Sequence, residues 1–130
     1  MILDGSQASA IETGAQTLHR GDLLAFPTET VYGLGADAGN DAAVAQIFAA
    51  KGRPAEHPLI VHVADVATAK KYVEWNEVAE KLATAFWPGA LTLILKRRVD
   101  SPISEPVSAG GDTLAIRIPA HRVAQQLLAA

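Results

Sequence analysis

The chain has 130 residues, of which 49% are hydrophobic and 19% charged, and its formal net charge is −3. This length and composition fit one globular domain with a sizeable core and exclude an intrinsically disordered segment. No apolar run approaches the roughly 20 residues of a membrane span, and the N-terminal residues do not have the pattern of a secretory signal. The sequence has no cysteine, which excludes disulfides, thiolate metal sites and thiol nucleophiles and leaves the cytoplasm as the default expectation.

The predicted elements alternate between helices and strands along the chain. Apolar spacing predicts helices at 6–20, 40–50, 65–72 and 76–86 and from 120 onward, with Ser6, Asn40 or Asp41, Asp65 and Asn76 at their starts. Short apolar runs predict strands at 23–26, 59–63, 91–95 and 113–118, and residues 28–39 are expected to form a loop. Strands separated by helices predict one α/β domain built on a sheet.

The first candidate for chemistry is the segment Pro27-Thr28-Glu29-Thr30-Val31-Tyr32-Gly33-Leu34-Gly35. It follows a predicted strand, where open α/β sheets place ligand-binding loops. Two hydroxyls, a carboxylate and a phenol within five positions offer hydrogen bonds to a small polar ligand. The alternative is an ordinary turn that needs glycine. The segment is neither a Walker loop nor a GxGxxG turn.

The second candidate lies after the second predicted helix, at Lys51, Arg53 and His57. Arg53 is on a loop rich in glycine and proline, where a guanidinium can bind a phosphate with two hydrogen bonds. The alternatives are that Lys51 only offsets the partial negative charge of the helix C-terminus, and that Arg53 forms a surface ion pair with Glu56.

The third candidate is the strand at 113–118, where alternation places Thr113, Ala115 and Arg117 on one face. Arg117 then points either to solvent or into a cleft, and solvent is the simpler reading. His62, within an apolar strand, is expected to be a core histidine. The four histidines have no metal-binding spacing, and no metal site is expected.

Four segments together closely resemble the YrdC/Sua5 family, the threonylcarbamoyl-AMP synthases of tRNA modification. They are PTETVYGLGADA at 27–38, KGRPAEHPLIVHV at 51–63, WPGALTLIL at 87–95 and LAIRIPAH at 114–121. The resemblance covers almost the whole chain and implies a twisted mixed α/β sheet flanked by helices, with a concave ligand cavity. It implies synthesis of threonylcarbamoyl-adenylate from L-threonine, bicarbonate and ATP with Mg²⁺, with no tightly bound cofactor. It also implies a partner enzyme that transfers the group to adenosine 37 of tRNA, and binding of double-stranded RNA.

The resemblance also implies roles for individual residues. Thr30, Tyr32, His62 and Arg117 match threonine-binding positions, and Lys51, Arg53, His57 and Thr113 match nucleotide-binding positions. Arg117 would pair with the threonine carboxylate, and no protein nucleophile is needed because positioning and charge neutralisation supply the catalysis.

The sequence departs from the family after the last helix. Relatives continue into a Ser-x-Asn segment that completes the nucleotide site, so the single domain at 1–130 is expected to be incomplete at its C-terminus, with an unpaired sheet edge that favours a homodimer. Two other functions stay open: a non-catalytic module that binds nucleotide or RNA, and the carbamoyl-adenylate-forming domain of hydrogenase maturation proteins.

Overall fold

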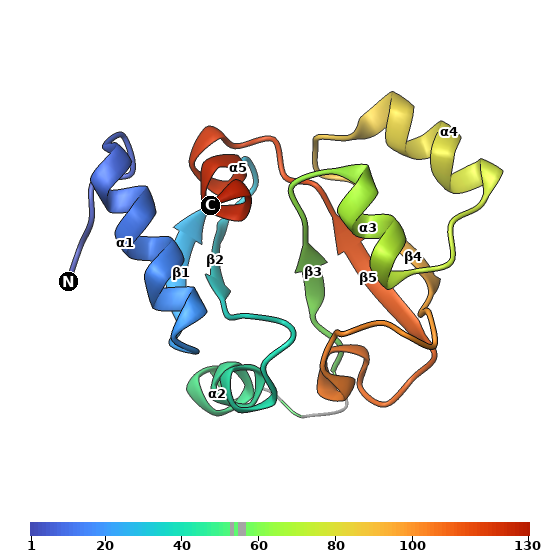
Figure 1. Ribbon diagram of the computed structural model, residues 1–130, viewed down its shortest axis with the longest axis horizontal. Helices are drawn as coiled ribbons and strands as arrows, with labels where there is room; N and C mark the ends of the chain where they lie inside the picture. The colour runs from blue at the N-terminus through green and yellow to red at the C-terminus, as the bar shows by residue number, and fades with distance from the viewer. Residues whose placement is uncertain (53, 55–56) are drawn as a thin grey trace.

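The computed structural model describes residues 1–52, 54 and 57–130. Its helices are α1 (Ala8–His19), α2 (Asp41–Lys51), α3 (Val66–Tyr72), α4 (Glu77–Phe86) and α5 (Arg122–Ala129), with a 3₁₀ turn η1 (Glu105–Ser108). Its strands are β1 (Leu24–Pro27), β2 (Tyr32–Gly35), β3 (Ile60–His62), β4 (Leu93–Lys96) and β5 (Thr113–Arg117) (Figure 1). Among the described residues, no helix has the length and hydropathy needed to cross a bilayer.

The strands form two separate sheets. β1 and β2 make an antiparallel hairpin, and the second sheet has the order β3-β5-β4. Within it, β5 is parallel to β3 and antiparallel to β4. Figure 1 shows α1 beside β1 on one side of the molecule, and β3, β5 and β4 on the other side with α3 and α4. The predicted class, a mixed α/β fold with helices flanking a mixed sheet, is confirmed.

The prediction of a loop over residues 28–39 was wrong for its middle part. Residues 32–35 form β2, which pairs with β1 from Leu24 opposite Gly35 to Pro27 opposite Tyr32. The sequence pattern does not predict this strand, because two of its four residues are glycines, which have low strand propensity. The hairpin pairing, which depends on the neighbouring strand, supplies the stability that the local sequence lacks.

Capping residues set the starts of three helices as predicted. The side chains of Asn40, Asp65 and Asn76 each accept a hydrogen bond from the backbone N–H three residues on, at the starts of α2, α3 and α4. Gly52 ends α2 in the left-handed conformation, with φ +61°. Ser6 was wrongly predicted to be a cap, because its hydroxyl donates to Asp4 and α1 begins without a side-chain cap.

The core is divided in the same way as the sheets. The larger cluster covers the sheet β3-β5-β4 and includes the fully buried Leu114 and Ile116 of β5, the central strand. The smaller cluster joins α1, β1 and α5 through Ala15, Phe26 and Leu127. Residues Leu114 and Ile116 therefore anchor β5 in the larger core. The C-terminal end of β5, at Arg117, faces the hairpin turn.

Candidate functional site

The tip of the β1–β2 hairpin is a tight turn held by Thr28. The Thr28 hydroxyl donates to the carbonyl oxygen of Val31 at 2.6 Å and accepts from the backbone N–H of Val31 at 3.2 Å. It also lies 3.0 Å from the Thr30 hydroxyl. The sequence needs a small hydroxyl residue here to satisfy a turn of this kind. The turn thereby fixes the direction of Glu29 and Thr30.

Arg117, at the C-terminal end of β5, points to this turn. Its side chain is only 9% exposed, so the reading of a solvated arginine was wrong. Its Nε donates to the carbonyl oxygen of Gly89 at 2.8 Å and its Nη1 donates to the Thr30 hydroxyl at 3.3 Å. Its Nη2 forms an ion pair with Oε1 of Glu29. The structure thus brings together two predicted threonine-binding residues, Thr30 and Arg117.

Glu29 is the functional candidate that sequence reasoning did not assign. Its second carboxylate oxygen accepts the backbone N–H of Ala120 at 2.6 Å, and its side chain is 27% exposed. Glu29 therefore ties the hairpin turn to both β5 and the segment before α5. A carboxylate between two threonines in a polar loop was the only signal in the sequence, and it did not point to Arg117.

His62 ends β3 directly beside Arg117, because the two residues are register partners in parallel strands. Its ring and the Phe26 ring form a T-shaped pair with a centroid distance of 6.1 Å, and its Nδ1 lies 3.3 Å from the carbonyl oxygen of Ile60. Burial is the main cause that lowers the pKa of His62; the Arg117 charge also lowers it, while the Ile60 carbonyl and Glu29 oppose the shift. The imidazole is therefore favoured in its neutral form, which can both donate and accept hydrogen bonds.

Gly89 is a further residue whose role the sequence did not reveal. It follows α4, where the Trp87 indole is partly buried and donates to the Leu91 carbonyl at 2.7 Å. Gly89 in addition supplies the carbonyl that accepts from Arg117. A Cβ at Gly89 would lie 2.5 Å from the carbonyl oxygen of Phe86, so only glycine fits.

The remaining predicted residues lie elsewhere. Tyr32 starts β2 and is 76% exposed. Lys51 is exposed at the C-terminal end of α2, His57 is exposed before β3, and Arg53 lies outside the described residues. Thr113 begins β5 and pairs with Lys96, so about 13 Å of strand separate it from Arg117. Thr113 thus lies at the opposite end of the strand from Arg117.

A pocket of about 650 Å³ lies between the two sheets. Phe26 and the stretch 33–39 line one side, and residues 58–64 of and around β3 line the other. Lys51 and His62 both line it, so one space reaches a residue from each predicted group. This volume is in the range of sites for small molecules.

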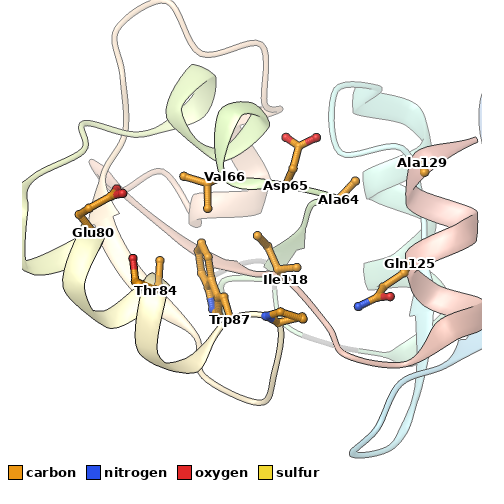
Figure 2. A pocket seen from close by; sticks show the side chains of 11 residues that line it. Ala64, Asp65, Val66, Glu80, Thr84, Trp87, Ile118, Gln125 and Ala129 are labelled. Atoms are coloured by element: carbon orange, nitrogen blue, oxygen red, sulfur yellow. The ribbon is translucent and has the colours of Figure 1, made fainter.

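A second pocket, of about 620 Å³, lies on the side of α4 and α5. Figure 2 shows Trp87 and Ile118 at its centre, Glu80 and Thr84 on one side and Gln125 on the other. Two of its polar side chains already have partners: Glu80 accepts from the Trp75 indole at 2.6 Å, and Gln125 donates to the Pro119 carbonyl at 3.1 Å. Among the predicted site residues that the structure describes, none lines this pocket.

The Arg117 site is suited to hold a small carboxylate. A buried guanidinium fixed by Thr30 and Gly89 offers directed N–H donors in a water-poor environment. The neutral His62 beside it adds a group that can contact a hydroxyl or an amine. In the described part of the chain, no group of three or more acidic or histidine side chains could hold a metal ion.

Comparisons with known proteins match the sequence and the fold of this chain. A family model named Sua5/YciO/YrdC, with the description telomere recombination, matches residues 16–130. Threonylcarbamoyl-AMP synthases of Bacillus subtilis and Pyrococcus abyssi are 49% and 47% identical over 119 residues, covering 91% of this chain and 34% of each relative. The crystal structure of P. abyssi Sua5 complexed with L-threonine has a TM-score of 0.90 and 43% identity, covering 99% of this chain and 37% of that chain.

A more distant structure shows the fold alone. Full-length HypF, in a phosphate- and nucleotide-bound form, has 24% identity and a TM-score of 0.78, covering 92% of this chain and 18% of that chain. The chain spans about a third of the length of the curated synthases named above. The match over residues 16–130 shows that this chain belongs to the Sua5/YciO/YrdC family.

Proposed function

We propose that this chain carries out the synthesis of L-threonylcarbamoyl-adenylate from L-threonine, bicarbonate and ATP, with release of pyrophosphate. The observation that carries the proposal is the buried Arg117 beside His62 and Thr30, in a chain almost half identical to threonylcarbamoyl-AMP synthases. The product would serve modification of adenosine 37 in tRNA through a separate transfer enzyme, and the setting would be the cytoplasm.

Threonine would bind with its carboxylate on Arg117. Thr30 and His62 lie next to this guanidinium and would contact the amino acid's other polar groups, and Tyr32, exposed at the start of β2, is proposed as a further contact. The neutral state of His62 supports this role, because a second positive charge would not help to hold a free amine. A free amine is what the reaction needs.

The chemistry needs no protein nucleophile. The neutral amine of threonine attacks the carbon of CO₂ derived from bicarbonate, and the proton lost from nitrogen passes to solvent. An oxygen of the resulting carbamate attacks the α-phosphorus of ATP in line, and the bond to pyrophosphate breaks. Mg²⁺ would arrive with ATP as part of the substrate. The protein's contribution would be positioning and neutralisation of charge.

The nucleotide would extend toward the residues at the other end of the pocket. Lys51 lines the pocket that His62 also lines, which supports contact between Lys51 and the ATP phosphates. Arg53, His57 and Thr113 are proposed as further nucleotide contacts. Two further proposals are association into a homodimer, which a concentration-independent monomer mass would refute, and binding of double-stranded RNA, which would weaken steeply with salt.

The test is release of pyrophosphate from the purified chain with ATP, Mg²⁺, bicarbonate and L-threonine. We expect release that requires both threonine and bicarbonate and is lost in Lys51→Ala and Arg117→Lys. The matched control is Arg98→Lys, because Arg98 is an exposed arginine paired with Asp100. Release that continues unchanged in Arg117→Lys would contradict the assigned site.

A complete absence of pyrophosphate release by this chain would have a different meaning. If the Bacillus subtilis relative releases pyrophosphate under the same conditions and this chain does not, the chain by itself is not a complete enzyme. Retained binding of duplex RNA or nucleotide in that case would favour the alternative of a non-catalytic binding module.

A further inference from the structure

We infer that Glu29 is a positioning residue for the amino-acid site, acting on the bound carboxylate through Arg117. The identity of the ligand as L-threonine rests on the proposed function. The role of Glu29 itself rests on three features of its contacts.

The first feature is the burial of the Arg117 charge. A guanidinium whose side chain is 9% exposed has lost most of its hydration and needs a counter-charge to remain in place. Glu29 supplies that charge from 88 residues away, through the ion pair with Nη2. Gly89 and Thr30 contribute only neutral oxygens. The charge of Glu29 is therefore what fixes the guanidinium in this position.

The second feature is that both oxygens of the Glu29 carboxylate accept a hydrogen bond. One oxygen meets Arg117 and the other accepts the N–H of Ala120 at 2.6 Å. The carboxylate thus sets the distance between the hairpin turn, the end of β5 and the segment that leads into α5. A glutamine of the same shape has one accepting oxygen, so Glu29→Gln must give up one of the two contacts.

The third feature is that Glu29 need not leave when a carboxylate binds. Arg117 has five N–H groups, and its hydrogen bonds to the described residues use three of them. The two that remain, one on each terminal nitrogen, suffice for a bidentate carboxylate. Displacing Glu29 would also cost its bond to Ala120. The geometry therefore favours a Glu29 that stays and orients Arg117 over one that competes with the ligand.

The experiment compares two ligands by calorimetric titration of the full chain. L-threonine has the carboxylate that Arg117 would hold, whereas L-threoninamide lacks that charge. We expect Glu29→Gln to weaken L-threonine binding by roughly 10- to 100-fold, the value of one hydrogen bond to a charged group. Binding of L-threoninamide should change little, so the affinity ratio between the two ligands falls. A merely structural defect would weaken both ligands alike.

A double-mutant cycle tests whether Glu29 acts through Arg117. Arg117→Lys should also lower the affinity ratio. Glu29→Gln combined with Arg117→Lys should lower the ratio no further than the single variant that has the larger effect. The matched control is Asp100→Asn, which makes the same carboxylate-to-amide change in the exposed pair with Arg98 and should leave both affinities unchanged.

Four results would overturn the inference while leaving the proposed function intact. Glu29→Gln could leave L-threonine binding unchanged, or tighten it, which would make Glu29 a competitor. It could also weaken both ligands alike, or the losses could be additive in the double variant. A wild-type chain that binds neither ligand would refute the proposed function and the inference together.

Discussion

Replacement of Gly35 by alanine tests how closely the hairpin packs against the site. A Cβ at Gly35 would lie 2.6 Å from Cε1 and 3.3 Å from Cδ1 of Phe26. Phe26 cannot easily move aside, because it is buried against Ala15 and Leu127 and its ring forms a T-shaped pair with His62. The φ angle of Gly35 is not positive, so the strain of the alanine variant would come from this clash alone.

The expected loss follows from two opposing effects. Overpacking of a filled core costs typically about 1–3 kcal/mol. Alanine also lowers the conformational entropy of the unfolded chain relative to glycine, which stabilises by about 0.4–1 kcal/mol. We therefore expect Gly35→Ala to lower the free energy of unfolding by roughly 1–2 kcal/mol.

Gly33 is the matched control on the same strand. A Cβ there would lie 3.8 Å from Cζ of Phe26, an ordinary van der Waals contact. Gly33→Ala should therefore leave stability unchanged or raise it by up to about 1 kcal/mol. Urea unfolding followed by the fluorescence of Trp75 and Trp87 measures both variants, with the slope in urea expected to stay constant. Equal stability of the two alanine variants would refute the reasoning.

Three further predictions concern the site, a helix cap and pH. Arg117→Met should lower the free energy of unfolding by about 2–4 kcal/mol because it leaves Glu29 unpaired, and Glu29→Gln in that background should recover part of the loss; a further loss in urea titrations would contradict this. Asn76→Ala should cost about 1 kcal/mol by removing the cap on the Ala79 N–H, whereas Asn76→Asp, which keeps a capping oxygen, should cost less in the same titrations. Burial lowers the pKa of His62 in the folded chain below its ordinary 6.5, so the unfolded chain binds the proton first as pH falls. The stability present above pH 6.5 is therefore lost as pH falls toward the folded pKa. His62→Gln should flatten this part of the curve of stability against pH, and parallel curves for the variant and the wild type would exclude the effect.

Local chemistry made much of the fold predictable. The starts of α2 and α4 at Asn40 and Asn76 and the end of α2 at Gly52 depend on groups within four residues of one another. The apolar runs that became β3, β4 and β5 are likewise visible in the chain. β2 was not predictable, because Gly33 and Gly35 carry no strand signal and the strand exists through its pairing with β1.

The candidate site also has features that the sequence predicts and features that depend on tertiary structure. The sequence by itself determined the residue types, Thr30 in a polar turn, His62 in an apolar strand and Arg117 in an alternating one, and their motifs pointed to the family. Whether Arg117 faced solvent or a cleft could not be decided by alternation, which defines the face of a strand and not what covers it. Only the tertiary structure brought Glu29 to Arg117 across 88 residues and opened a pocket between two sheets. The physical reason is that burial and ion pairing depend on which distant segments meet, and no local pattern records that.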